Sequence, residues 1–447
     1  MLKEELKAVL EELASLFDKP LYMVGGAVRN ILLNYAVDDI DLAAALPPDK
    51  VIAALRSTPF KVKVNSKKLF TLAIIKDGFR FEYTSFRTDS YKKGFHRPHK
   101  SEFTEDLTQD ALRRDFTANA VYYDILEKKL IDPLNGAEDI KKRILKTVTS
   151  PQEVFGQDGL RLMRLARQAA ELGFEVEERT FNAAEDNAFL IQDIAPERIR
   201  DEFNKIVSAD CRYGNEGGHV KGLRYLEKLG LLPFILPELV KCKGIKQRRD
   251  YHKYDVYGHV TKAYELAPPH IRLAALFHDI AKPLCIREDG SMKGHDIKGQ
   301  EVARQIMGRL RYSNDEINKT VRLVKLHMYD LKCDKESGEL KSFVQENHDI
   351  IQDLIALKRA DYAASGNLKG DCLCAARLEK IYQEMVDKKI PFTVKDLKVR
   401  GGDLIEMGIP EAKRGRLLEK LLKAAINEDL LSRAAQLEYL EKNKNKD

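Results

Sequence analysis

The spacing of apolar positions changes once along the chain, near Glu153. Before that point, apolar and polar residues alternate in four short runs, which is the period of a strand with one buried face. After it, apolar residues recur every three to four positions, as in amphipathic helices. The pattern predicts an α+β fold with a small mixed-sheet head and a long all-helical remainder. The runs predicted as strands are 21–26, 38–46, 69–87 and 120–132.

Turn and cap residues punctuate these runs. Lys76-Asp77-Gly78 and Glu127-Lys128-Lys129 separate apolar alternations and predict two hairpins. Residues 1–17 predict an amphipathic helix, and Gly173 stands where a helix C-cap is expected. Residues 407–410, Met-Gly-Ile-Pro, predict that one helix stops and another begins.

Length and charge limit the organisation. A chain of 447 residues exceeds what one core usually organises. The changes of pattern predict a head at 1–145, a neck at 146–220, a body at 221–365 and a tail at 366–447. The net charge of +6, from 76 basic and 70 acidic residues, favours a local basic surface over a globally basic protein.

Neither the hydropathy nor the cysteines indicate a membrane or a zinc site. No apolar run reaches the roughly 18 residues of a membrane span, so we expect a cytoplasmic protein with no membrane partner. The six cysteines lack the C-x2-C pairing of structural zinc sites, which favours reduced thiols. The Cys372-x-Cys374 spacing is too tight for the usual zinc ligands.

The segment from Met23 to Ala43 combines a glycine pair with two aspartates. Asp39 and Asp41, two positions apart on a predicted strand, would place two carboxylates on one face about 7 Å apart. Such a pair suits Mg²⁺, and two ions can assist an in-line phosphoryl displacement. Gly25-Gly26 lets backbone N–H groups approach a phosphate, and Arg29 in the following helix adds a guanidinium.

These motifs resemble the head of the class II tRNA nucleotidyltransferases, the CCA-adding enzymes, and of the similar bacterial poly(A) polymerases. The resemblance rests on G-G-A-V-R from Gly25, D-x-D from Asp39, E-Y-T-S-F-R from Glu82, R-R-D-F-T-A-N-A from Arg113, and D-P-L-N-G-A-E-D-I from Asp132. It implies a polymerase-β-like mixed sheet, two Mg²⁺ ions on Asp39 and Asp41, and nucleotide contacts from Gly25 and Gly26.

Two positions depart from the family motif, and two residues of R-R-D-F-T carry expected roles. Asn30 stands where the family has Asp, and Asn34 where it has Gly. Arg114 can meet phosphate or base, and Asp115 can accept hydrogen bonds from ribose hydroxyls. Glu82 is a candidate third carboxylate, although the resemblance implies that two aspartates suffice.

A helix predicted after Gln157 carries a polar stripe. Asp158, Arg161, Arg164 and Arg167 follow at three-residue steps, so they share one face. Three arginines in a row repel unless an anion lies against them. The stripe resembles the family's E-D-x-x-R-x-x-R-x-x-R motif with Gln157 in place of Glu, which implies that Asp158 and Arg161 read the base. Arg164 and Arg167 are then expected toward the triphosphate.

The helical body carries a second constellation of metal-binding residue types. The order H, HD, D resembles the HD phosphohydrolases, which hold divalent metals with these side chains. The adjacent pair His278-Asp279 is expected on one helix. The expected ligands are His259, His278, Asp279 and Asp361, and His295 and His327 lie between them in the sequence.

The resemblance implies that tRNA is the partner and that CTP and ATP are the substrates, with no DNA. Two basic segments, 241–255 and 411–423, are the expected phosphate contacts to the tRNA 3′ end and elbow. The polar segment 87–103 resembles the family's flexible loop. We expect a CCA-adding enzyme that releases pyrophosphate. The alternatives are an A-adding enzyme, a poly(A) polymerase, an HD phosphohydrolase acting on RNA ends, or an RNA-binding scaffold.

Overall fold

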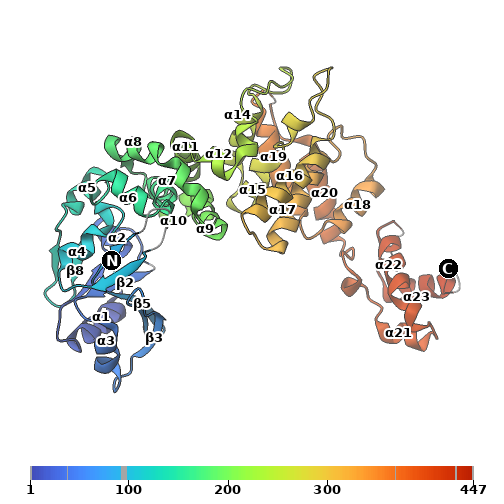
Figure 1. Ribbon diagram of the computed structural model, residues 1–447. Helices are drawn as coiled ribbons and strands as arrows, with labels where there is room; N and C mark the ends of the chain where they lie inside the picture. Colours follow the sequence, from blue (N-terminus) through green and yellow to red (C-terminus); the bar gives the residue numbers. More distant parts are fainter. Residues whose placement is uncertain (1–2, 38, 92–97, 368, 428–429, 445–447) are drawn as a thin grey trace. The chain divides into compact units, whose positions relative to one another are not determined.

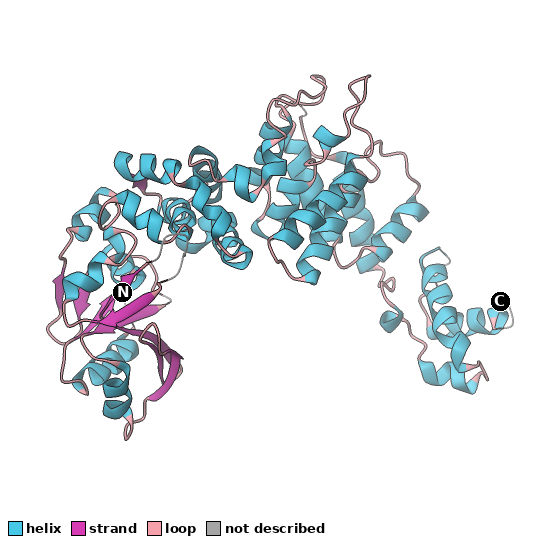
Figure 2. Cartoon of the chain, in the orientation of Figure 1, coloured by secondary structure: helices cyan, strands magenta, loops and turns pink. Residues whose placement is uncertain are grey.

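The computed structural model describes residues 3–37, 39–91, 98–367, 369–427 and 430–444. The chain forms two compact units, Met1–Pro237 and Glu238–Asp447 (Figure 1), and we describe each by itself. All described strands belong to the first unit (Figure 2). No helix in the described residues is long and apolar enough to cross a membrane.

A seven-stranded mixed sheet organises the beginning of the chain. The strand order is β3-β4-β5-β2-β1-β8-β9, and only the β2 and β5 neighbours run parallel. The two central strands, β1 and β2, therefore lie beside each other in the middle of the sheet. The strands are β1 Leu21–Val24, β2 Ile40–Ala44, β3 Lys61–Ser66, β4 Thr71–Lys76, β5 Phe79–Ser85, β8 Tyr122–Asp124 and β9 Lys129–Ile131.

Short helices flank this sheet and connect its strands. Helix α1 (Glu4–Ser15) buries Leu6, Val9, Leu10 and Leu13, which recur at helical spacing and give the helix one apolar face. The other helices of the head are α2 Gly26–Leu32, α3 Pro48–Leu55, α4 Leu107–Leu112 and α5 Gly136–Lys142, with a 3₁₀ turn η1 at Thr117–Asn119.

The neck continues the first unit with helices around α7 (Leu160–Leu172). Most of α7 is buried, and it ends at Gly173, which has the left-handed φ of 69° that a helix C-cap requires. The other elements are β10 Ile144–Leu145, α6 Pro151–Gln157, β11 Glu175–Val176, α8 Glu178–Asp186, η2 Ala188–Asp193, α9 Pro196–Val207, α10 Ala209–Tyr213, α11 Gly218–Lys228 and α12 Leu232–Ile235.

The second unit is helical throughout its described residues and has separate apolar clusters. One cluster runs from Ala263 to Ile426, and a smaller one joins Leu397 to Leu440. The helices are α13 Pro237–Val240, α14 Val256–Leu266, η3 Pro269–Ile271, α15 Arg272–Phe277, η4 Lys282–Leu284, α16 His295–Arg309, α17 Asn314–Leu326, α18 Ser337–Glu346, α19 Ile351–Ala364, α20 Leu373–Asp387, η5 Val394–Asp396, α21 Gly401–Glu406, α22 Glu411–Asn427 and α23 Arg433–Asn443.

The fold confirms the predicted mixed-sheet head and helical remainder. Both hairpins form, with Asp77, Gly78 and Lys128 at positive φ in the turns. The alternation missed β3, whose side chains are exposed or only partly buried. It also missed the hairpin of β6 (Arg87–Ser90) and β7 (Lys100–Phe103) within the predicted loop 87–103. Residues 92–97 of that loop lie outside the described residues.

Candidate functional site

The register of the central strands places the glycine turn beside the carboxylate pair. Val24, the last residue of β1, is paired with Asp41 of β2. Gly25 follows with a φ of 74°, and a Cβ atom built there would lie 3.1 Å from Oδ2 of Asp41. A side chain at this position would therefore crowd the carboxylate, in a backbone region that favours glycine.

Asp39 and Asp41 point away from the core on either side of a buried residue. Ile40 is 5% exposed, whereas both aspartates are exposed. Asp39 lies just before β2 rather than within it. Its Oδ2 is 3.8 Å from Arg212, and no described side chain donates a hydrogen bond to Asp41. The predicted carboxylate pair is thus formed with oxygens available for a cation.

The electrostatics at Asp41 favour an added positive charge. The surrounding protein desolvates the carboxylate and raises its pKa, while Arg114 opposes the rise and Glu82 and Asp39 add to it. Glu82 is the register partner of Asp41 on β5, but its oxygens accept hydrogen bonds from Arg80 and Asn65. The negative charge of Glu82 therefore helps to raise the pKa of Asp41, while the Glu82 carboxylate itself is hydrogen-bonded to Arg80 and Asn65.

The R-R-D-F-T segment contributes one cation and one anion to the site. Arg114 donates from Nε to Tyr122 and from Nη2 to Asp110, and these partners raise the pKa of Arg114 against the effect of burial. Asp115 accepts from Arg164 at 2.8 and 2.7 Å. Burial alone would raise the pKa of Asp115, but Arg164 and Asn119 lower it well below its usual value.

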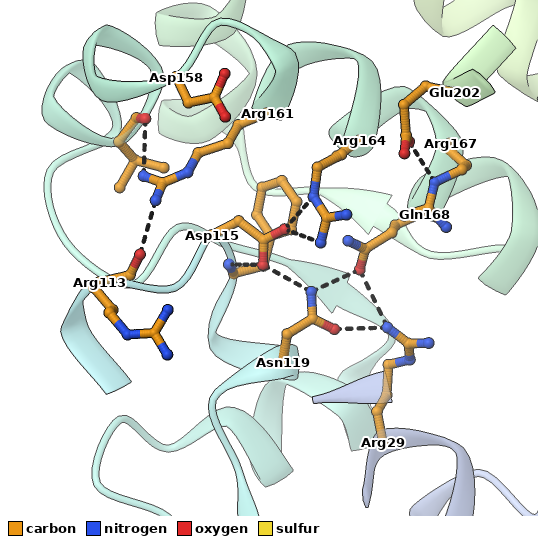
Figure 3. Close-up of polar contacts among 12 residues, drawn as sticks. Arg29, Arg113, Asp115, Asn119, Asp158, Arg161, Arg164, Arg167, Gln168 and Glu202 are labelled. Carbon is orange, nitrogen blue, oxygen red and sulfur yellow. Dashed lines mark hydrogen bonds and ion pairs between the residues drawn. The ribbon is translucent and has the colours of Figure 1, made fainter. Parts of the chain in front are cut away.

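Arg29 is held by neutral side chains. It is 6% exposed, and Nη1 lies 2.6 Å from Oδ1 of Asn119 and 3.3 Å from Oε1 of Gln168 (Figure 3). Nη2 donates to Asn30 at 3.0 Å, and Asn30 also donates to Tyr213. Asn30 thus orients Arg29 without a charge. Burial lowers the pKa of Arg29, and its Nε is buried with no hydrogen-bond partner among the described atoms.

The three arginines of α7 line the same cavity, and two of them, Arg164 and Arg167, pair with carboxylates of the protein itself. Arg164 binds Asp115 and Arg167 binds Glu202 (Figure 3). Arg167 also forms a buried ion pair with Glu171. For Arg167, the anions that such a row requires are the two buried carboxylates Glu171 and Glu202.

The proposed base readers lie at the start of the same helix. Asp158 was expected on one helix with the arginines, but it lies in the break between α6 and α7 and accepts from the backbone of Leu160. Its Oδ2 accepts from Arg198 at 3.0 Å. Arg161 donates to Gln157 and to the carbonyls of Val154 and Arg113. Both side chains are therefore fixed in place by hydrogen bonds.

The glycine turn, the two aspartates and the arginines described above line one cavity of about 550 Å³ between the head and the neck. Ten of its lining side chains are cationic and five are aspartates, so it suits a polyanion larger than phosphate. The aspartates include the exposed pair, Asp39 and Asp41, and Asp158. The cationic residues are Arg29, Arg87, Arg113, Arg114, Arg161, Arg164, Arg167, Arg198, Lys205 and Arg212.

Sequence reasoning missed several cavity residues that come from distant elements. Asn119 was quoted within the R-R-D-F-T-A-N-A motif, which was the available signal for it. Gln168 follows the arginine stripe directly and bonds both Asn119 and Arg29. Arg198 on α9 and Arg212 on α10 had no sequence signal beyond their charge, because only the fold brings them to the cavity.

A second cluster of ligand-type side chains lies in the second unit. Nε2 of His259 lies 3.1 Å from Nε2 of His278 and 2.9 Å from Oδ1 of Asp361. These three residues could together hold a metal ion. The aspartates more than offset the effect of burial and raise the pKa of His278 to about 10. A divalent cation would replace that proton as the partner of the carboxylates.

Asp279 joins this cluster to a second one. Its Oδ2 is 3.3 Å from Nε2 of both His259 and His278, and its Oδ1 is 3.1 Å from Nε2 of His295. His327 lies 3.7 Å from the same Oδ1. His295 and His327 therefore join the four expected ligands and complete a second possible metal group with Asp279.

The imidazoles are oriented by the backbone. Nδ1 of His278, His295 and His327 each lies 2.6–2.8 Å from a backbone carbonyl, so each Nδ1 donates to the backbone and Nε2 is the atom directed into the cluster. His278 and Asp279 were expected on one helix, but α15 ends at Phe277, and both residues stand just past its end. Lys282 pairs with Asp279 at 2.5 Å.

The two basic segments differ in structure. Segment 411–423 is helical within α22, whereas 241–255 is mostly turns between α13 and α14. In the latter, Arg248 pairs with Asp250 at 2.5 Å, and Lys282 donates to Gln247.

Comparison with known families identifies three regions. Residues 21–146 match the poly A polymerase head domain, 173–242 match the probable RNA and SrmB-binding site of polymerase A, and 249–365 match the HD domain. A CCA-adding enzyme of Geobacillus sp. (strain WCH70) is 41% identical over 186 residues, which cover 42% of this chain and 45% of that protein. The chain thus matches less than half the length of that relative.

A longer match comes from Deinococcus radiodurans. Its A-adding tRNA nucleotidyltransferase is 31% identical over 369 residues, covering 77% of this chain and 76% of that protein. Among solved structures, a Bacillus stearothermophilus CCA-adding enzyme in complex with CTP has a TM-score of 0.69 at 23% identity, covering 99% and 98% of the two chains. A Thermotoga maritima CCA-adding enzyme complexed with tRNA has a TM-score of 0.57 at 18% identity, with 99% and 96% covered. These structures share the fold.

Proposed function

This chain belongs to the family of tRNA nucleotidyltransferases and poly(A) polymerases, and from that premise we propose that it adds CCA to the 3′ end of tRNA from CTP and ATP. The observation that carries the proposal is that the exposed pair Asp39 and Asp41 lines a cavity that is also lined by ten cationic side chains. That arrangement combines a cation site with a polyanion site, as transfer from a triphosphate requires.

The carboxylate pair fits two Mg²⁺ ions. Both residues line the cavity, and desolvation raises the pKa of Asp41 although Arg114 opposes the rise. Mg²⁺ held by Asp39 and Asp41 would supply charge stabilisation at the α-phosphate and at the attacking 3′-hydroxyl. Gly25 leaves room beside Asp41 for the phosphates, and Arg114 lies next to both. Pyrophosphate is the leaving group.

Two other residues that line the cavity, Asp158 and Arg161, support recognition of the nucleotide. Asp158 can accept from an exocyclic amino group, and Arg161 can donate to ring nitrogens or carbonyl oxygens. Cytosine and adenine both offer that amino group, whereas uracil lacks it and would leave the carboxylate unpaired. Asp115 is the proposed acceptor for ribose hydroxyls. Without a nucleotide, it accepts a hydrogen bond from Arg164.

The helical elements are proposed to hold the tRNA. The neck region matches an RNA-binding family, and helix α22 carries the basic segment 411–423. Contacts from Lys and Arg to phosphates give affinity without reading sequence, which suits an enzyme that accepts all tRNAs.

The test is incorporation of labelled CTP and ATP into three tRNA transcripts, lacking CCA, ending in CC, and ending in CCA, with Mg²⁺ and purified protein. The proposal expects the first transcript to gain CCA and then stop. Addition of A only to the CC transcript would assign the A-adding activity that the Deinococcus relative is named for. Long A tails on any RNA would assign poly(A) polymerase activity.

A second candidate function is specifically favoured by the converging Nε2 atoms around Asp279. We propose that this cluster binds one or two divalent metals and hydrolyses phosphate esters or cyclic phosphates at RNA ends. The test is Asp279→Ala, assayed for both activities in the full chain. Loss of hydrolysis with retained transfer supports the proposal, whereas loss of transfer with retained hydrolysis contradicts it.

A further inference from the structure

Two cysteines meet at the beginning of a helix beside the histidine cluster. Cys372 is the N-cap of α20, and Cys374 lies in its first turn. Both are 4% exposed, and their Sγ atoms are 3.3 Å apart. The two sulfurs are thus in contact, and a small approach would bring them to bonding distance.

The surroundings of Cys374 favour its thiolate. Nζ of Lys358 is 3.8 Å from Sγ of Cys374 and is fixed by the carbonyls of His327 and Tyr329 at 2.7 and 2.6 Å. The hydrogen bond from Cys372 lowers the pKa of Cys374, and Lys358 and the backbone at Ala375 act in the same direction. The same hydrogen bond and burial raise the pKa of Cys372. The pair therefore divides into a reactive thiolate and a neighbouring thiol.

Small molecules have a route to this pair. Both cysteines line a cavity of about 580 Å³, together with Lys332, Lys358 and part of the histidine cluster. Leu373, between the cysteines, is 71% exposed, so the turn lies at the protein surface. The lysines in the cavity wall favour an anionic reagent such as a glutathione species.

We propose that Cys372 and Cys374 form a reversible redox pair that exchanges with low-molecular-weight disulfides. Sγ of Cys374 attacks one sulfur of the disulfide, its S–S bond breaks, and one thiolate leaves and takes a proton from water. Cys372 then gives up its proton and attacks Sγ of Cys374, and the second thiol leaves. One disulfide is reduced to two thiols while the cysteine pair loses two electrons. This inference does not depend on the nucleotidyltransferase proposal.

The test uses the full-length protein in glutathione buffers of increasing oxidised fraction. Samples are quenched with acid, alkylated with N-ethylmaleimide and digested with trypsin. Cleavage after Lys369 and Arg377 releases residues 370–377, Gly-Asp-Cys-Leu-Cys-Ala-Ala-Arg, which contain both cysteines. As the oxidised fraction rises, we expect this peptide to lose both alkyl groups together. Its mass should then be that of the unalkylated dithiol peptide minus two hydrogen atoms. Reduction followed by alkylation should restore both groups.

Single variants test the assigned roles. Cys372→Ser should leave a stable glutathione adduct on Cys374, whereas Cys374→Ser should form its adduct at Cys372 roughly tenfold more slowly. Cys333→Ser is the matched control, because Cys333 lines the same cavity, and it should leave the peptide result unchanged.

Three results would overturn the proposal. The first is a wild-type peptide that keeps two alkyl groups in every buffer. The second is a wild-type peptide that accumulates a glutathione adduct without closing the intramolecular bond. The third is dependence of the oxidised peptide on Cys333, which would make Cys333 the bonding partner.

Discussion

The cavity of the head and the histidine cluster of the second unit are organised around opposite charges. The head cavity has twice as many cationic side chains as carboxylates, and several of its arginines already bind protein carboxylates. The histidine cluster instead directs imidazole Nε2 atoms and two carboxylates toward each other, and backbone carbonyls fix the Nδ1 atoms of His278, His295 and His327.

The difference indicates how each site becomes loaded. A triphosphate entering the head cavity must compete with internal ion pairs such as Arg164 with Asp115, so binding there requires an exchange of partners. A metal entering the histidine cluster displaces protons from ligands that are already oriented. The first site is proposed for anionic substrates and the second for cations, and the two can be disabled separately.

The largest expected effect comes from Asp41→Asn. Removing one carboxylate of the pair should lower nucleotide transfer on the order of 10³-fold or more, because both metals depend on it. Hydrolysis at the histidine cluster should be unchanged. The matched control is Glu82→Gln, the register partner of Asp41, whose carboxylate is engaged by Arg80 and Asn65. An equal loss in both variants would show that the effect is general electrostatics rather than metal binding.

Arg167→Ala should sharpen the contrast between the α7 arginines. Arg167 is buried between Glu171 and Glu202, so its loss removes the nearest cation from two buried carboxylates and leaves them only Arg212 and Lys205, each 3.6 Å away. This change should destabilise the protein by about 3–5 kcal/mol. Arg164, whose side chain is 36% exposed, should tolerate Ala with a smaller loss of stability and a higher KM for the nucleotide. Denaturant unfolding and steady-state kinetics measure the two quantities. Equal unfolding free energies for the two variants would contradict the assignment.

Asp279→Asn should affect the second site alone. The carboxylate faces both metal groups, so its removal should lower phosphoesterase activity on the order of 10²-fold and reduce the bound metal measured by mass spectrometry. His270→Ala is the control, because His270 lies in the same unit but pairs with Asp353 outside the cluster. Unchanged metal content in Asp279→Asn would refute the proposed coordination.

Asp110 should make the stability of the protein depend on pH, with a smaller effect than the changes above. Burial alone would raise its pKa, but Arg113, Arg114 and Tyr122 lower it to about 2. A carboxylate whose pKa is depressed adds stability above its unfolded value near 3.8, and that stability is lost as the pH falls through about 2. Asp110→Asn should therefore cost about 2 kcal/mol or more at neutral pH, and the difference should shrink in acid.

Unfolding followed by circular dichroism across this pH range measures the Asp110 effect. Glu105→Gln is the comparison, because Glu105 pairs with Lys19 at the surface and should change stability by less than about 0.5 kcal/mol. A difference between wild type and Asp110→Asn that does not vary with pH would mean that the ion pairs are not its source.

Local chemistry accounts for what the sequence predicted correctly. Asp77-Gly78 specified a hairpin because both residues adopt positive φ, and Gly173 specified the end of α7 for the same reason. The glycine turn and the aspartates were expected to contact the nucleotide and the metals, and the pairing of Val24 with Asp41 places the turn beside Asp41. Strand β3 was not predicted because it is an edge strand without a buried face, whereas the pattern used to predict strands is that of a half-buried strand.

The remaining features depend on contacts between distant residues. Gln168 and Arg29 are 139 positions apart in sequence and meet only through the packing of α7 against the head. The carboxylates that neutralise Arg167 are likewise visible only in three dimensions. His295 and His327 were noticed as histidines, but their pairing with Asp279 needed the packing of α16 beside the end of α17.

The position of Asp279 has a thermodynamic consequence. One carboxylate presents Oδ2 to the first histidine pair and Oδ1 to the second, so an ion on either oxygen fixes the rotamer that the other ion needs. Two bound ions would also share the single negative charge of Asp279, which opposes binding of the second ion. If the cluster binds two ions as proposed, their binding should be linked, and a metal titration of the full chain should follow one coupled isotherm instead of two separate ones.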